Sequence, residues 1–245
     1  MDWQDDGIVL STRRHGETGS IIMLMTEGHG RHAGLARGQR LRAQLQPGAR
    51  ARANWRARLS DHLGSYALEP LDGGPAALID DPLRLAALSS ACALVEAALP
   101  ERAPYLAVHQ GLGALLSTLE GDFWDAAYVQ WEIGLLGALG FGLDLQRCAA
   151  TGANDSLAWV SPRSGRAVSL SAGEPYRDRL LPLPGFLVGR GEADPPAILQ
   201  GLEMTGHFLA RNLFAQAHLN VPPARERFVE RYRKMATTSG SLPAS

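Results

Sequence analysis

The chain has 245 residues, of which 45% are apolar and 20% charged, so the composition is that of a globular protein with a real core and excludes a disordered one. Its two cysteines are too few for a disulfide framework or a four-thiolate zinc site. The N-terminus is acidic, and no segment reaches 18 consecutive apolar residues. We therefore expect a cytoplasmic protein with no signal peptide and no membrane span.

The net charge of −1 conceals a strong asymmetry along the chain. Ten arginines stand between Gly7 and Ser60 against only Glu17 and Glu27, a balance of +8, so the rest of the chain carries −9. No Asp or Glu occurs between Gly28 and Ser60. Such asymmetry favours a module that faces nucleic acid, joined to a more acidic body.

The first 70 residues hold five short apolar or β-branched runs, which Gly-rich turns separate. Five short strands in so few residues predict a small barrel, for which an OB-fold is the leading candidate. We place this domain at residues 1–79. The expected strands are Gly7–Leu10, Ser20–Met25, His32–Ala36, Ala49–Leu59 and Gly64–Leu68.

The fourth run alternates strictly between apolar and polar residues, which is typical of a half-buried strand. Trp55 falls on its apolar side, so burial is favoured over stacking on a base. The polar side is mostly arginine, whose planar fork suits phosphate. We predict a sequence-independent DNA-binding surface; a solvated edge strand is the alternative. The predicted DNA-binding residues are Arg31, Arg37, Arg40, Arg42, Arg50, Arg52, Arg56 and Arg58.

The remainder predicts helices, so the expected fold class is α+β: the barrel, then a mainly helical domain at 80–236. Asp81 and Asp194 precede prolines and predict helix starts, Asp122 predicts a third, and Gly140 a helix end. Residues 143–190 are irregular and predict an insertion with one hairpin, Leu157–Val160 with Ala167–Leu170. A long helix is expected from Asp194 to about Leu219, and a disordered tail at 237–245.

The last predicted helix contains Arg225–Lys234, with five basic residues and two glutamates. It is either a solvated face or a second basic patch for DNA or an acidic partner, and the sequence leaves both open.

Catalytic motifs for nucleotide binding, acyl transfer or metalloprotease chemistry are absent from the sequence. His29 and His32 have metal-ligand spacing, but no nearby acid or cysteine completes a site. We expect no catalytic residue, no metal, no cofactor and no small-molecule substrate.

Several motifs together resemble the RecO family of bacterial DNA repair proteins, over nearly the whole chain. They are G-I-V-L-S-T-R-R-H-G-E-T (Gly7–Thr18), G-L-A-R-G-Q-R (Gly34–Arg40), L-G-F-G-L-D-L-Q-R-C-A-A-T-G (Leu139–Gly152), S-P-R-S-G-R-A-V-S (Ser161–Ser169) and L-L-P-L-P-G-F (Leu180–Phe186).

The resemblance implies a recombination mediator that binds single- and double-stranded DNA and anneals complementary strands. It implies RecR and the acidic C-terminal tail of single-stranded DNA-binding protein as partners, loading of the RecA recombinase, and a place on the nucleoid when bound to DNA. Many members bind zinc in the insertion through two C-x-x-C pairs. Here Cys148 stands alone and no histidine occurs from Arg147 to Met204, so we expect no zinc.

Two other classes remain open. One is an RNA-binding barrel protein, and the other is a protein-interaction scaffold whose arginines meet an acidic partner.

Overall fold

The computed structural model describes residues 1–38, 43–59, 61–72, 74, 76–154 and 156–239. Contacts divide the chain into two compact units. The first is Met1–Glu120 with Pro222–Phe228, and the second is Gly121–Val221 with Val229–Ser245. None of the helices within the described residues combines the length and the apolar character needed to cross a membrane.

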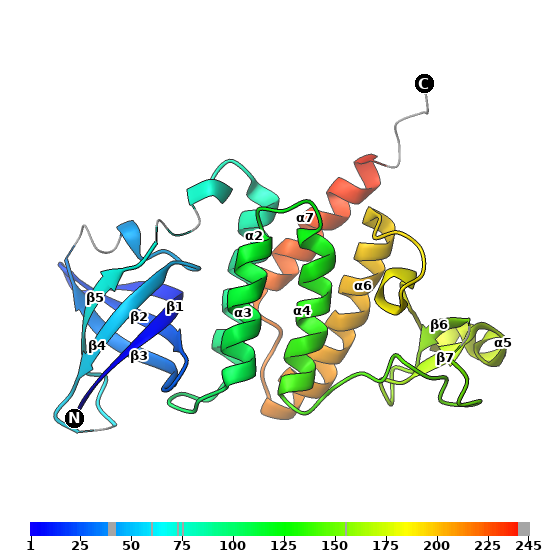
Figure 1. The fold of residues 1–245 in the computed structure, drawn as a ribbon, viewed down its shortest axis with the longest axis horizontal. Coiled ribbons are helices and arrows are strands. Elements are labelled where there is room, and N and C mark those ends of the chain that lie inside the picture. Colours follow the sequence, from blue (N-terminus) through cyan, green and yellow to red (C-terminus); the bar gives the residue numbers. More distant parts are fainter. Residues whose placement is uncertain (39–42, 60, 73, 75, 155, 240–245) are drawn as a thin grey trace. The chain divides into compact units, whose positions relative to one another are not determined.

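The first unit is built on a closed barrel with the strand order β1-β2-β3-β5-β4 (Figure 1). This confirms the expected small OB-like barrel and the α+β fold class. The strands are β1 (Asp2–His15), β2 (Gly19–Thr26), β3 (Gly30–Arg37), β4 (Arg50–Arg56) and β5 (Ser65–Pro70).

Strand β1 closes the barrel because it pairs with two neighbours. Its first half, Asp2–Ile8, pairs antiparallel with β4, and its second half, from Gly7 on, pairs with β2. The register shifts between Val9 and Ser11, and a bulge of this kind lets one strand bend from one partner to the other.

The alternation predicted for the fourth run is present in β4. Ala51, Ala53 and Trp55 face the core and are 3% exposed or less, which confirms the burial of Trp55. The expected strand was longer, Ala49–Leu59, but β4 ends at Arg56. Arg56 pairs with Asp2, where β1 begins; Ala57 still exchanges backbone hydrogen bonds with Met1, and the chain then turns into the β4–β5 loop.

Helix α2 (Pro82–Ala98) of the first unit packs against β1, and α3 (Leu106–Thr118) approaches the barrel where Gly113 lies beside Ile8 and Arg50. Asp81 caps α2 as predicted, because its carboxylate accepts hydrogen bonds from two backbone N–H groups of the first turn. The connection between the helices reaches β3, where Arg102 N–H donates to the carbonyl of Arg31 at 2.8 Å. A short helix, η1 (Ala76–Leu78), precedes α2.

The second unit contains α4 (Trp124–Ala138), α6 (Pro195–Phe208) and most of α7 (Pro223–Ser239). The stripe of Trp124, Tyr128 and Trp131 is buried in its core, as the spacing indicated. Asp194 caps α6. Asp122 does not cap α4: the chain turns through Asp122, and the cap position is Phe123 with no side-chain hydrogen bond.

The other helix ends differ in detail from the expectation. Regular α-helix stops at Phe208 and continues as a π-helical segment, Leu209–Phe214, and a 3₁₀ turn, Ala215–Ala217. Helix α7 runs to Ser239, into the segment expected to be disordered, and its Thr237 and Thr238 hydroxyls bond back to carbonyls of the preceding turn.

The insertion forms a three-stranded sheet with the order β7-β6-β8, from β6 (Leu157–Val160), β7 (Ala167–Ser169) and β8 (Leu181–Pro182). The hairpin of β6 and β7 was expected, whereas β8 was not. Short helices α5 (Leu170–Gly173), η2 (Glu174–Arg179) and η3 (Gly185–Val188) complete it.

Gly30→Ala should destabilise the protein by about 2–3 kcal/mol, because Gly30 has a left-handed φ of 65° and an added Cβ would overlap the Ala103 backbone. Gly16→Ala is the matched control: its φ is 63°, but nothing lies within 4 Å of an added Cβ, so about 1 kcal/mol is expected. Urea unfolding measures both. Equal losses in the free energy of unfolding for the two variants would show that a Cβ at Gly30 does not clash with the α2–α3 connection.

Candidate nucleic-acid interface

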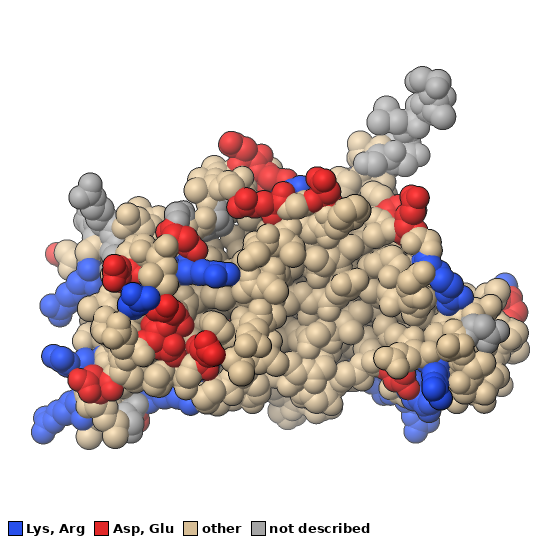
Figure 2. Space-filling view, viewed as in Figure 1, with Lys and Arg blue, Asp and Glu red and all other residues tan. Residues whose placement is uncertain are grey.

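The arginines of β4 lie opposite the acidic residues of β1. Arg52 pairs with Asp6 across the strands through two nitrogens, at 2.9 and 3.2 Å, and this contact raises the pKa of Arg52. Arg56 is 4.0 Å from Asp2, and both side chains are largely exposed. Figure 2 shows the resulting mixture of positive and negative side chains over the barrel. Residues 28–60 contain no acidic residue, but the fold places the acidic residues of β1 beside them.

Two more of the predicted residues contact the helical part of the first unit. The Arg50 guanidinium donates to the carbonyl of Gly113 in α3 at 3.4 Å. Arg31 lies 3.8 Å from Glu101 in the α2–α3 connection. Both are thus drawn toward the helices, and neither extends freely from the barrel.

The remaining arginines extend from loops and strand ends. Arg37 ends β3 and Arg58 lies in the β4–β5 loop; both are exposed, and neither has an acidic partner among the described residues. Arg14, which was not among the predicted site residues, is equally exposed and bonds only to the carbonyl of Gly16 in that part of the chain. Arg40 and Arg42 lie outside the described residues.

Arg37 stands between the two loops that flank an OB-fold's binding face. Its register partner is Gly19, directly after the β1–β2 turn, and Gly38 N–H bonds to Thr18. Two residues earlier, Leu35 N–H donates to Gly64 in the β4–β5 loop. Arg14, Arg37 and Arg58 therefore follow the loop side of the barrel, and we name them the loop arginines.

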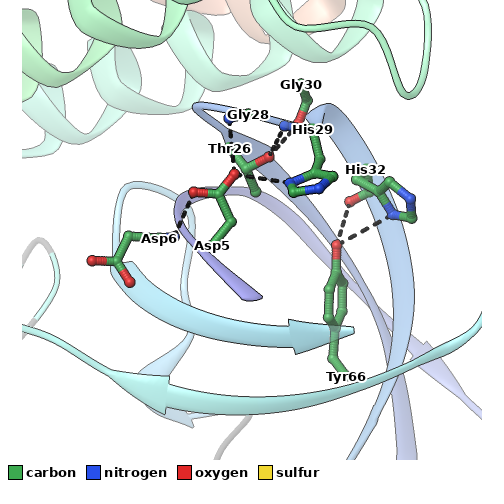
Figure 3. A network of polar contacts seen from close by, with 8 residues as sticks. All are labelled: Asp5, Asp6, Thr26, Gly28, His29, Gly30, His32 and Tyr66. Carbon is green, nitrogen blue, oxygen red and sulfur yellow. Dashed lines mark hydrogen bonds and ion pairs between the residues drawn. The ribbon is translucent and has the colours of Figure 1, made fainter. Parts of the chain in front are cut away.

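The β2–β3 turn is fixed by a polar network around Asp5 (Figure 3). The Asp5 carboxylate accepts from Gly28 N–H at 2.8 Å and pairs with His29 Nδ1 at 3.1 Å. Partial burial opposes ionisation, but these hydrogen bonds outweigh it and lower the pKa of Asp5. Thr26 Oγ1 accepts from His29 N–H and donates to Gly30 O, which closes the turn.

The aromatic rings of the barrel gather beside this turn. Trp3 stacks on His29 at 4.2 Å and on Trp55 at 5.8 Å between ring centroids. His32 is buried, which lowers its pKa, and the hydroxyl of Tyr66 donates to its carbonyl oxygen. His29 and His32 thus have packing and hydrogen-bonding roles, and no group of three or more His, Cys, Asp or Glu within the described residues is placed to hold a metal ion.

A groove of about 510 Å³ crosses three rungs of the β1–β4–β5 face. Its outward side chains are Asp2, Gln4, Asn54, Arg56, Ser65 and Ala67. The rung of Arg56 and Ser65 is the point where the β4–β5 loop leaves and rejoins the sheet.

The insertion is the region in which the family resemblance implies a zinc site. Cys148 is fully buried, and Ser169 N–H approaches its Sγ at 3.3 Å. Burial raises the pKa of the Cys148 thiol, but hydrogen bonds from Ser169 and Thr151 outweigh this effect and lower the pKa to about 6. One cysteine with hydroxyl neighbours is not the set of four Cys or His donors that structural zinc needs, so the residues do not fit the ion.

A closed five-stranded barrel followed by a helical body with a small insertion defines an OB-type barrel-and-helix protein. Family models described as "Recombination protein O N terminal" and "Recombination protein O C terminal" match residues 1–72 and 79–219. The chain therefore belongs to the RecO family, as the motifs indicated. The two matches leave residues 73–78 between them, whereas contacts divide the chain after Glu120, so that α2 and α3 belong to the same unit as the barrel.

Relatives named "DNA repair protein RecO" match along the full length. The protein of Rhodospirillum centenum is 60% identical over 249 residues, which cover 100% of each chain. That of Rhodospirillum rubrum is 51% identical over 245 residues, covering 96% of this chain and 97% of the relative. That of Phenylobacterium zucineum is 51% identical over 236 residues, covering 94% and 97%.

Asp5→Asn should lower stability at pH 7 by about 1 kcal/mol, because a partly exposed charged hydrogen bond is lost. Since the folded-state pKa of Asp5 is lowered, its contribution is present above the unfolded pKa and is lost as the pH falls through the folded one. The gap between wild type and variant in urea unfolding should thus narrow as the pH falls from about 4 and close well below that value. A gap that persists there would contradict the assignment.

Purified protein should contain no stoichiometric zinc, as measured by elemental analysis after gel filtration. Treatment with a chelator should leave its melting temperature unchanged, because no described cluster supplies the ligands. Zinc at one ion per chain, retained through gel filtration, would overturn this.

Proposed function

We propose that this chain is a non-catalytic DNA-binding recombination mediator in DNA repair. The observation that carries the proposal is its membership of the RecO family over the full length. It binds single- and double-stranded DNA without sequence preference and promotes annealing of complementary strands. Neutralising the phosphates of two strands on one protein lowers their repulsion, which is the physical basis of annealing.

The loop arginines, Arg14, Arg37 and Arg58, are the strongest candidates for phosphate contacts, and Arg56 is the fourth. Their guanidinium groups are exposed, and Arg56 has only a weak partner, which a phosphate can replace at little cost. Arg52 must first leave Asp6, whereas Arg31 and Arg50 must leave the helices. Of the eight residues predicted from sequence, Arg37, Arg56 and Arg58 therefore have the best support.

The partners follow from family membership alone. We propose that the protein works with RecR and with the acidic C-terminal tail of single-stranded DNA-binding protein to help load RecA. It would act in the cytoplasm, on the nucleoid when bound to DNA. Helix α7 carries exposed basic residues, but Arg233 is already paired with Glu203 and Glu230, so we do not place a DNA contact there.

The test is fluorescence anisotropy of a labelled single-stranded oligonucleotide at several salt concentrations. Wild type should show a steep negative log–log salt slope that is independent of base sequence. The triple variant Arg14→Ala/Arg37→Ala/Arg58→Ala should bind more weakly and flatten the slope by about two units, since each phosphate contact on a single strand contributes about 0.7.

A charge-matched control is available in the second unit. Arg147→Ala/Arg163→Ala/Arg179→Ala removes three exposed arginines of the insertion region and should leave the slope unchanged. Equal effects of the two triple variants would remove the loop arginines from the site. No binding by wild type even at low salt would favour the scaffold alternative, and tighter binding to RNA of the same sequence would favour the RNA-binding one.

A further inference from the structure

The described residues of the β4–β5 loop, 57–59 and 61–64, are largely exposed and yet held by hydrogen bonds. The indole N–H of Trp55 donates to Leu63 O at 3.0 Å. From the α2–α3 connection, Arg102 Nη2 donates to the carbonyls of Asp61 and His62, at 3.2 and 2.9 Å. These bonds tie the loop to the barrel below it and to the helical connection beside it.

Arg102 has a backbone conformation that fits this role. Its φ is 62°, in the left-handed region that non-glycine residues rarely adopt and that costs about 1 kcal/mol. Its N–H is bonded to Arg31 in β3, so the backbone is fixed where the side chain can reach the loop. An unfavourable conformation persists only where its surroundings enforce it, and here it sets the position of the β4–β5 loop.

The loop held in this way exposes apolar surface. Leu59 is 53% exposed and Leu63 38% exposed, while the neighbouring Arg58 is also exposed. Single exposed leucines are ordinary, but two on one anchored loop beside a cationic side chain form an amphipathic contact surface. Asp61 on the same loop is also exposed, so the loop offers an apolar face and the contact with negative charge falls to Arg56 at its base.

The groove begins where the loop does. Arg56 and Ser65, which form one rung, lie at the base of the loop and line the groove. Two residues further along the sheet, past the rung of Trp55 and Tyr66, Gln4 and Asn54 are cross-strand partners that offer two exposed amides, and Ala67 leaves room beside them. The sheet thus brings together three kinds of group within a few residues of one another: a cationic side chain, two amides that donate and accept hydrogen bonds, and an apolar loop.

We propose that this groove and the β4–β5 loop form a subsite for an unstacked nucleotide of single-stranded DNA. Leu59 and Leu63 contact the base, Arg56 the phosphate, and the amides of Gln4 and Asn54 the edge of the base. This rests on the proposed DNA-binding function and extends it from phosphate to base contacts. In a duplex the bases are stacked and paired, so the subsite favours single strands over double strands.

The experiment compares wild type with Leu59→Ala/Leu63→Ala by anisotropy, on single-stranded and duplex probes of about 12 nucleotides. Both leucines are exposed, so the variant should fold. We expect about a tenfold loss of affinity for the single strand, no change for the duplex, and an unchanged salt slope. Leu106→Ala/Leu219→Ala, which removes leucines of 47% and 50% exposure elsewhere, is the matched control and should change neither.

Arg102 is a positioning residue in this proposal, and Arg102→Lys tests it. Lysine keeps the charge but has a shorter side chain, so its ammonium group cannot take the position from which Arg102 Nη2 donates to both loop carbonyls. The ratio of single-strand to duplex affinity should fall about threefold or more, while the duplex affinity, which a general loss of folded protein would lower, stays constant.

Equal losses on both probes, or no loss for Leu59→Ala/Leu63→Ala on the single strand, would overturn the subsite. These outcomes leave DNA binding itself intact. Failure of wild type to bind either probe at low salt would instead overturn the proposed function.

Discussion

The barrel depends on one strand that belongs to two pairings. β1 must leave β4 and join β2 within a few residues, and Gly7 is where both ladders meet, because it pairs with Thr26 and with Ala51. A Cβ at Gly7 would lie 2.9 Å from Thr26 Cγ2, so the crossing needs a residue without a side chain. The same path brings the acidic start of the chain alongside β4. Closure of the sheet and neutralisation of its arginines are thus consequences of one strand.

This arrangement changes where a polyanion would bind. Along the sequence, the arginines of β4 form an uninterrupted row, but Asp6 and Asp2 face two of them, and Arg50 turns to α3. Positive charge without a described counter-charge is then concentrated at the loop end, around Arg37 and Arg58. Loops that a rigid scaffold positions commonly carry the binding groups of a barrel. The sheet supplies the scaffold, and its loops supply the contacts.

Local patterns predicted much of this fold. Alternation identified β4, proline after aspartate identified the starts of α2 and α6, and Gly140, with φ 86°, ends α4 as expected. What the sequence did not reveal is non-local. The pairing of Asp6 with Arg52 joins residues 46 apart, and Arg102 reaches a loop 40 residues away. β8 has two residues, too few for any periodicity to be visible. Such contacts are fixed by register and packing, which no single segment encodes.

The pairing of acidic residues on β1 with arginines on β4 also affects how the affinity for polyanions can evolve. Loss of one carboxylate at Asp2 or Asp6 would release an arginine that is already in place, so the attraction for polyanions can increase without any new basic residue. Gain of an acid on the neighbouring β5, where Glu69 already stands opposite Arg52, would have the reverse effect. Affinity is therefore adjustable in small steps by substitutions on strands that do not carry the arginines, while the folded barrel is left unchanged.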